Sequence, residues 1–168
     1  MIIRRLDESD AAAFRVLRLH ALQESPEAFG SSYEETLAQP LEWMAERLRL
    51  APERPHDFVL GAFDPDLVGM VGFARETRTK TRHKGAIWGM YVAESARGHG
   101  VGRALLERLL VEARAQSGLE AITLLVVATN EAAKRLYHSF GFQTYGTEPH
   151  ALKLGNRYYD EDLMVLRL

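Results

Sequence analysis

A glycine-rich stretch, Arg97-Gly98-His99-Gly100-Val101-Gly102, carries the residues of this chain that are best suited to chemistry. Glycines at alternate positions allow successive backbone N–H groups to point at a ligand with no Cβ in the way. The stretch leads into an amphipathic helical pattern over Leu105 to Leu110, and a helix N-terminus attracts anions. Arg97 adds a planar positive group that suits phosphate oxygens. Residues Arg97–Arg103, called the cradle below, are therefore predicted to hold a diphosphate.

The spacing of the cradle excludes two familiar phosphate loops. A P-loop requires Gly-Lys-Ser/Thr at its end, whereas Gly102 is followed by Arg103 and Ala104. A dinucleotide fingerprint requires its third glycine three positions after the second, whereas here the third follows two positions after Gly100. A glycine turn that only caps a helix, without any ligand, is the structural alternative.

A second motif follows the strand-like run Ile122–Val127. Asn130 is a good N-cap and Gly141 a good C-cap, so the residues between them are predicted to form a short helix. Tyr137 shares one face of this helix with apolar residues at three- and four-residue spacing. Tyr137 is therefore either a core aromatic residue or a phenol placed for function.

Together the two motifs resemble the GCN5-related N-acetyltransferase (GNAT) superfamily. The matching patterns are Arg97-Gly98-x-Gly100-x-Gly102 and Asn130-x-x-Ala133-x-x-Leu136-Tyr137-x-x-x-Gly141-Phe142, each after a strand. The resemblance implies an α/β fold with a mixed, mostly antiparallel central sheet of about seven strands, flanked by about four helices. Two parallel strands, here Ile87–Val92 and Ile122–Val127, are expected to splay apart at the cofactor site.

The resemblance also implies the cofactor site and one catalytic group. The cradle is expected to wrap the diphosphate of coenzyme A, and main-chain groups of the preceding strand to pair with the pantetheine arm. Tyr137 is expected near the sulfur as the general acid. The residues expected at the cofactor are Met90, Tyr91, Val92, Arg97, Gly98, His99, Gly100, Val101, Gly102, Arg103, Asn130 and Tyr137.

The reaction implied is direct transfer of an acetyl group from acetyl-coenzyme A to a primary amine in a ternary complex. Because an ammonium has no lone pair, a base must first remove a proton. The strand Ile87–Val92 carries no carboxylate, although many relatives place a glutamate there. Glu34 and Glu35 are the first candidates for the base, and Glu76, Asp160, Glu161 or a water chain are alternatives.

The acceptor is expected to be a small-molecule amine, and the acidic pair Glu34-Glu35 favours a cationic one. Phe29, Tyr33, Tyr158 and Tyr159 are candidates to line its pocket, although core packing would explain these aromatic residues nearly as well. Three other functions stay open: a non-catalytic sensor of acyl-coenzyme A, a protein N-terminal or lysine acetyltransferase, and a nucleotide-binding or structural module.

Composition sets further limits. At 168 residues the chain fits one domain spanning residues 1–168, and a net charge of −2 gives no field for binding nucleic acid. The absence of cysteine excludes disulfides, thiolate metal sites and a cysteine nucleophile. The six histidines lack metal-ligand spacing, so acetyl-coenzyme A is expected as cosubstrate with no metal. The sequence predicts a cytoplasmic protein without a membrane span, and a homodimer stays open.

The helices and strands that position these residues are expected to begin and end near prolines and glycines, which interrupt regular secondary structure. A basic tip, Thr77–Gly85, is either a solvated hairpin end or attracts the 3′-phosphate of coenzyme A. The other expected elements are a strand Ile2–Leu6, a helix to Glu24, a loop Glu27–Gln39, a helix Leu41–Leu50 ended by Pro52 and Pro55, a hairpin of Phe58–Phe63 with Leu67–Glu76, and final strands Phe142–Gly146 and Asp162–Leu168.

Overall fold

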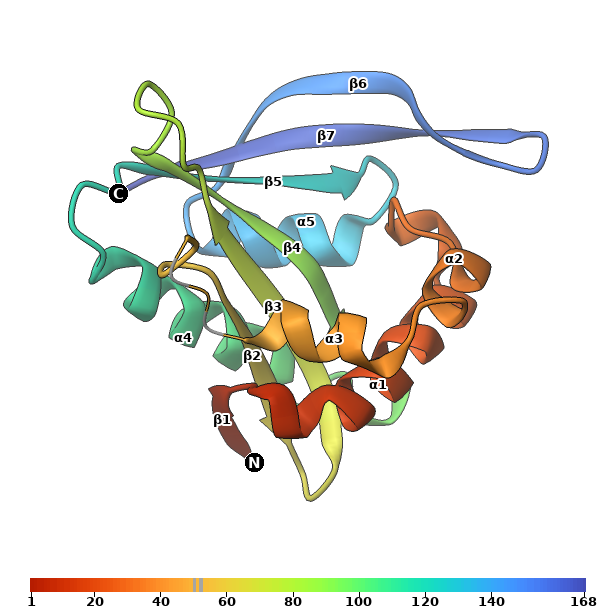
Figure 1. Cartoon of the computed structure of the whole chain (residues 1–168). Coiled ribbons are helices and arrows are strands. Elements are labelled where there is room, and N and C mark those ends of the chain that lie inside the picture. The colour runs from red at the N-terminus through yellow and green to blue at the C-terminus, as the bar shows by residue number, and fades with distance from the viewer. Residues whose placement is uncertain (50, 52) are drawn as a thin grey trace.

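Seven strands form one mixed sheet in the order β1-β2-β3-β4-β5-β7-β6 in the computed structural model, which describes residues 1–49, 51 and 53–168 (Figure 1). Neighbouring strands are antiparallel except for β4 and β5, which run parallel. The strands are β1 (Ile2–Arg5), β2 (Phe58–Phe63), β3 (Leu67–Arg75), β4 (Lys84–Val92), β5 (Ala121–Val127), β6 (Gln143–Leu154) and β7 (Arg157–Arg167).

Helices cover both faces of this sheet (Figure 1). Residues on β2 alternate between two cores, because successive side chains of a strand point to opposite faces: Phe58 and Leu60 pack towards α4, whereas Val59 packs towards α1 and α3. The predicted α/β fold is confirmed. The helices are α1 (Ala11–Glu24), α2 (Tyr33–Leu37), α3 (Leu41–Leu48), α4 (Val101–Arg114) and α5 (Glu131–Ser139), with short 3₁₀ turns η1 (Glu8–Asp10), η2 (Pro26–Ala28) and η3 (Glu94–Ala96).

A β-bulge in β4 separates it from β5. Met70 of β3 pairs with Tyr91 and Gly72 pairs with Trp88, so β4 carries one extra residue between these pairs. Gly89 lies in this bulge with φ +62°, a left-handed conformation that glycine adopts without a steric penalty. The pairing of β4 with β5 covers only Lys84–Ala86, before the bulge, and the rest of β4 does not pair with β5. The predicted splay of two parallel strands is confirmed, although the pairing lies before the predicted strand start at residue 87.

The segment predicted as a loop over Glu27–Gln39 contains α2, so that prediction was wrong. Ser32 caps α2 by accepting a hydrogen bond from the Glu35 backbone N–H at 3.1 Å, and the Glu35 carboxylate accepts one from the Ser32 N–H at 3.0 Å. This reciprocal pair is a capping box, and its Ser-x-x-Glu spacing marks a helix start.

The last two strands are longer than predicted. The first of them was expected to end at Gly146 and the second to start at Asp162. In the structure they form a hairpin in which β6 continues to Leu154 and β7 starts at Arg157. The outer part of this hairpin carries mostly exposed residues and lacks the apolar run by which a buried strand is detected. The third helix ends at Leu48 rather than residue 50; Leu50 and Pro52, named in that prediction, lie outside the described residues.

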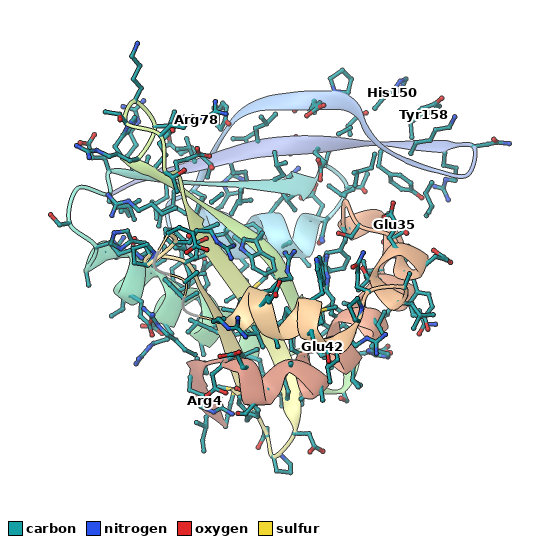
Figure 2. All side chains as sticks on the ribbon, in the orientation of Figure 1. Arg4, Glu35, Glu42, Arg78, His150 and Tyr158 are labelled. Atoms are coloured by element: carbon teal, nitrogen blue, oxygen red, sulfur yellow. The ribbon has the colours of Figure 1, made fainter. Side chains whose placement is uncertain are left out.

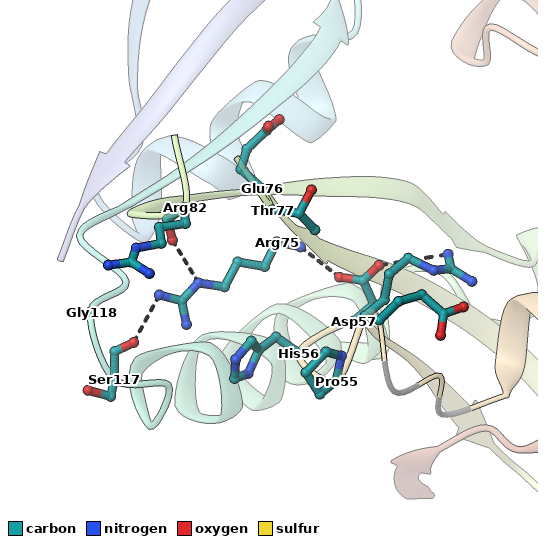
Figure 3. Close-up of a pocket in the computed structure, with 11 residues that line it drawn as sticks. Pro55, His56, Asp57, Arg75, Glu76, Thr77, Arg82, Ser117 and Gly118 are labelled. Atoms are coloured by element: carbon teal, nitrogen blue, oxygen red, sulfur yellow. Dashed lines mark hydrogen bonds and ion pairs between the residues drawn. The ribbon is translucent and has the colours of Figure 1, made fainter. Parts of the chain in front are cut away.

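A hollow of about 480 Å³ lies where β3 ends and β4 begins (Figure 3). Arg75 fills one side of it and donates hydrogen bonds to the carbonyls of Arg82 and Ser117 at 2.8 and 2.9 Å. The Asp57 carboxylate accepts a hydrogen bond from the Arg75 backbone N–H at 2.8 Å. These polar groups satisfy one another and tie three loops together, so the hollow has a structural explanation.

The basic tip lies at this same end of β4, as the position of Arg78 in Figure 2 shows. The cradle follows the opposite end of β4, nine residues along, which is a separation of roughly 30 Å along an extended strand. The basic tip is therefore a hairpin end far from the cradle. This position does not favour the alternative in which the tip attracts the 3′-phosphate of coenzyme A.

Candidate active site

A cleft of about 680 Å³ opens at the splay. The end of β4, the first turn of α5, the cradle and η2 all line this cleft. Its lining comes from three stretches that are far apart in the sequence, within residues 25–29, 90–103 and 127–136. Its lining residues are Ser25, Glu27, Ala28, Phe29, Met90, Tyr91, Val92, Ala96, Arg97, Gly98, Gly100, Val101, Gly102, Arg103, Val127, Thr129, Asn130, Ala132, Ala133 and Leu136.

The cradle turns its backbone towards open space. Gly98 and Gly100 both have φ +79°, and a Cβ built on either glycine would meet no atom within 4 Å. Gly100 is the N-cap of α4, and the first N–H groups of an α-helix have no partner within the helix. Unpaired donors at the positive end of a helix dipole favour an anion. The predicted anion cradle thus has suitable geometry; His99, by contrast, is exposed and does not line the cleft.

The Arg97 side chain ties the cradle to its surroundings. Its Nε donates to the Val92 carbonyl at 2.9 Å, and its Nη2 donates to the Glu24 carboxylate. The positive charge that the sequence assigns to a diphosphate is therefore shared with a carboxylate of α1. Arg97 keeps about half of its side chain exposed, at 47%, so the guanidinium can still face a ligand in the cleft.

Sequence reasoning missed the polar cluster under Arg97. The Tyr91 hydroxyl donates to the Glu24 carboxylate at 2.6 Å and lies 3.0 Å from His20 Nδ1. The Tyr91 hydroxyl and then the Arg97 guanidinium lower the pKa of Glu24, while burial and the neighbouring Glu24 charge raise the pKa of Tyr91. The i, i+4 spacing of His20 and Glu24 on one helix places them on one face, but it carries no motif that marks a site.

Asn130 and Tyr137 are both on or next to α5, in different surroundings. Asn130 lines the cleft, and its side chain caps α5 by accepting a hydrogen bond from the Ala133 N–H at 3.1 Å. Tyr137 does not line the cleft and is 5% exposed, with its ring edge-on to Phe142. None of the hydrogen bonds among the described residues involves its hydroxyl. Burial raises the pKa of the Tyr137 phenol to about 12.

The two first candidates for the base do not line the cleft. Glu34 and Glu35 are exposed on α2, and the capping box holds the Glu35 carboxylate (Figure 2). Hydrogen bonds from Ser32 lower the pKa of Glu35, which makes it a weaker base. Of the alternatives, Glu76 accepts a hydrogen bond from the Thr81 hydroxyl at 3.2 Å and Asp160 accepts one from the His150 N–H at 2.7 Å.

Of the carboxylates that the sequence offers as a base, Glu161 is the one whose register places it beside the splay, whereas Glu27 of η2 is the carboxylate among the residues that line the cleft. Glu161 pairs across the sheet with Val127, which lines the cleft, and on its other side with Glu148. Asp162, its neighbour on β7, contacts Lys134 of α5 at 3.0 Å, so Glu161 points to the opposite face, on which α1 and α3 lie. Glu161 is half-buried, and burial together with the Glu148 charge raises its pKa.

The structure brings one of the four candidate aromatic residues to the cleft. Phe29 lines it, with its ring centroid 6.5 Å from that of Tyr91. Tyr33 is half-buried on α2 and does not line the cleft. Tyr158 stacks on His150 at 4.5 Å between ring centroids, far out on the β6–β7 hairpin, as Figure 2 shows. Tyr159 lies beside it on β7, under the Arg157 guanidinium at 5.5 Å.

Residues 1–49, 51 and 53–168 form neither a metal-binding cluster nor a membrane-spanning helix. No group of three or more His, Cys, Asp or Glu side chains in this part of the chain could hold a metal ion. No helix formed by these residues is long and apolar enough to cross a membrane.

Comparison with known proteins gives consistent matches. Residues 18–142 match the model of the acetyltransferase (GNAT) family. The chain is 28% identical to a mycothiol acetyltransferase of Brachybacterium faecium over 84% of its own length and 40% of that protein. It is 35% identical to an L-methionine sulfoximine/L-methionine sulfone acetyltransferase of Salmonella typhimurium over 47% of its length and 46% of that protein. The chain thus spans less than half of either curated relative.

A solved structure matches the whole fold. The structure of yncA from Salmonella typhimurium, which contains its cofactor acetyl-CoA, aligns with a TM-score of 0.79 and 27% identity. The alignment covers 100% of this chain and 94% of the other.

Proposed function

This chain belongs to the acetyltransferase (GNAT) family, and we propose that it transfers an acetyl group from acetyl-coenzyme A to a primary amine of a small molecule. The cleft at the splay carries this proposal, because it joins an anion cradle to an unpaired strand edge, and Glu161 lies on the neighbouring strand β7 opposite the lining residue Val127. The amine attacks directly in a ternary complex, which needs no nucleophile from the protein. The two cores share one sheet, which supports a single domain over residues 1–168.

The residues of the cleft fit acetyl-coenzyme A. Backbone N–H groups of the cradle would bind its diphosphate, and the φ +79° glycines leave space for the close approach this requires. Beyond Ala86 the edge of β4 facing β5 has no strand partner among the described residues, so main-chain groups of Met90 and Val92 can pair with the pantetheine arm. The cofactor supplies an activated acetyl thioester. The related structure of yncA contains the same cofactor.

Glu161 is our proposed base. It points to the face from which an acceptor can reach the splay, and its raised pKa makes its carboxylate a better proton acceptor than an ordinary one. The Glu148 carboxylate beside it on β6 adds negative charge that attracts an ammonium group. A proton removed from the acceptor at Glu161 leaves the amine with the lone pair that it needs for attack.

Tyr137 is our proposed general acid. A phenol with a pKa of about 12 stays protonated at neutral pH, and none of the hydrogen bonds among the described residues involves its hydroxyl. Dry surroundings also raise the pKa of a thiol above its ordinary value of about 8.5, so donor and departing thiolate become better matched. The hydroxyl would donate to the sulfur as negative charge develops there.

A small-molecule acceptor is supported by the curated relatives. One is named for mycothiol and the other for L-methionine sulfoximine and L-methionine sulfone. Residues of η2 line the cleft, and η2 packs against β5 and β6. These residues take up space beside the cofactor site, which favours a compact acceptor over a folded protein surface.

Thiol release from acetyl-coenzyme A with a panel of primary amines tests the proposal. Tyr137→Phe keeps the ring and removes the donor, so we expect kcat to fall by about 10²–10⁴ with coenzyme A affinity nearly unchanged. Tyr145→Phe, the same change at a residue 60% exposed on β6, is the control and should keep wild-type rates. Coenzyme A binding without thiol release for any amine would favour a sensor, and wild-type rates in Tyr137→Phe would remove the general-acid role.

A further inference from the structure

Arg18 on α1 and Arg47 on α3 are among the arginines that have no carboxylate partner in the described part of the chain, and both lie on the α1–α3 face of the sheet. Arg18 Nη1 is fully enclosed and makes no hydrogen bond. The Arg47 guanidinium lies over the Trp43 and Trp88 rings, 4.6 and 4.9 Å from their centroids. Arg4, by contrast, pairs with Asp10, and Arg15, which is also on α1, donates hydrogen bonds to the Leu37 and Gln39 carbonyls.

The Arg18 guanidinium lies beside the cleft. It is 4.6 Å from the centre of the Phe29 ring, and Phe29 lines the cleft. Its Nη1 is 3.7 Å from the position that a Cβ on Gly89 would take. Gly89 belongs to the bulge that opens the splay, and its neighbour Met90 lines the cleft. Arg18 is therefore next to the point at which β4 leaves β5.

An enclosed guanidinium without an anion is unfavourable, because it has lost water and gained no charged partner. Burial, with a smaller contribution from the Arg47 charge, lowers the pKa of Arg18 to about 10. Stacking on the Phe29 ring offsets part of this cost but leaves Nη1 without a hydrogen-bond acceptor. An anion at the outer edge of the guanidinium would offset the remainder, since a planar guanidinium binds a carboxylate through two parallel hydrogen bonds.

We propose that Arg18, assisted by Arg47, binds a carboxylate of the acceptor, which is then an amine that also carries a carboxylate, such as an amino acid. This inference rests on the proposed function, because it assigns one part of the acceptor to the same cleft. The positive pair on α1 and α3 and the negative pair Glu148 and Glu161 act on the same face of the sheet. A zwitterion would meet opposite charges at its two ends.

The two tryptophans of the chain, Trp43 and Trp88, both lie against Arg47, so their fluorescence reports binding at this place without any turnover. The protein saturated with coenzyme A is titrated with L-leucine, L-phenylalanine and L-methionine. The matched amines without a carboxylate are isopentylamine, 2-phenylethylamine and 3-(methylthio)propylamine. Acetyl transfer to every compound is measured in parallel by thiol release.

We expect at least one amino acid to bind ten-fold or more tightly than its amine, and Arg18→Gln to weaken that binding by about 10- to 100-fold, the range of a charged hydrogen bond. Arg18→Lys keeps the charge without the planar group, so its affinity for the amino acid should lie between those of the wild type and Arg18→Gln. Arg114→Gln makes the same change at an exposed residue in the last turn of α4 and should alter binding less than two-fold.

Two results would overturn the carboxylate site: wild-type protein that binds each amino acid no better than its amine, or Arg18→Gln that weakens both classes equally. Carboxylate-dependent binding that Arg18→Gln removes, without acetyl transfer to any compound, would retain the anion site and count against the proposed function. Acetyl transfer to the amines, without tighter binding of the amino acids, would support the proposed function and overturn the carboxylate site.

Discussion

Replacing Gly102 by alanine tests the approach of coenzyme A to the cradle backbone without disturbing the fold. Gly102 lies in the first turn of α4 and has no left-handed φ. A Cβ there would lie 3.5 Å from the Leu136 and Met90 side chains and 3.7 Å from that of Val92, which are ordinary van der Waals distances. Alanine therefore fits the empty protein, but its methyl group would project between three residues that line the cleft.

The two expected effects have opposite signs. Alanine in a helix is favoured over glycine by up to about 1 kcal/mol, which corresponds to a rise in Tm of about 2–4 °C for a chain of this size. A phosphate oxygen that accepts a hydrogen bond from the cradle backbone approaches within about 3 Å of the nitrogen. The added methyl group occupies part of that approach, so we expect coenzyme A affinity to fall at least ten-fold, about 1.4 kcal/mol or more.

Calorimetric titration with coenzyme A and a thermal melt measure both effects on one sample. Gly146→Ala on β6 is the control, because its Cβ would also meet an ordinary contact, at 3.7 Å from Leu163. Gly98→Ala is a poorer test, since φ +79° strains any residue with a Cβ by about 1–2 kcal/mol. A Gly102→Ala protein with raised Tm and wild-type affinity for coenzyme A would refute the placement of the diphosphate on this backbone.

Three further predictions follow from the charges of the site and the sheet. Arg97→Ala should weaken coenzyme A binding by about 10- to 100-fold by calorimetry, the value of a charged hydrogen bond; unchanged affinity would leave Arg97 a purely structural role. Activity should rise with pH through the raised pKa of Glu161, and Glu161→Gln should lower kcat/KM by about 10² or more and remove that acidic limb from the pH–rate profile. The Thr147 hydroxyl and the Lys134 ammonium lower the pKa of Asp162 in the folded state, so its stabilisation is present above the unfolded value of about 3.9 and is lost as pH falls through the lower folded value. Thermal melts of Asp162→Asn should show a lower Tm at pH 7 and a smaller further loss below about pH 4 than the wild type, and parallel curves would contradict this.

The parts of the site that the sequence predicts are those defined by local spacing. The cradle glycines and the Asn130 cap can be read from a few neighbouring residues, because a left-handed turn and a helix start have strict residue requirements. The Ser32-x-x-Glu35 capping box was equally readable, and it reveals α2 within the predicted loop. The lengths of β6 and β7 were predicted too short, because the outer halves of these strands pair with each other and carry few buried residues.

The contacts that could not be predicted join residues distant in the sequence. Arg97 and Glu24 are 73 residues apart, and Tyr91 and His20 are 71 apart. Neither pair has a sequence signature, since charged and polar side chains on an amphipathic helix, such as Glu24 and His20 on α1, are usually solvated. The same limit applies to the base. Glu161 stands out from other carboxylates only after the sheet register places it between Val127 and Glu148.

The bulge in β4 links recognition of the cofactor to recognition of the acceptor. The extra residue turns Met90 and Val92 away from β5, which opens the cleft, and it also places Gly89 against Arg18. Just before the bulge, Trp88 lies so closely over Gly72 of β3 that a Cβ there would come within 2.1 Å of its ring. Gly72 thus allows the tryptophan to lie flat beneath Arg47, and Gly89 allows the strand to bend. A side chain at either glycine would alter the positions of the arginines and of the strand edge together, so the two binding functions cannot vary independently at this point of the sheet.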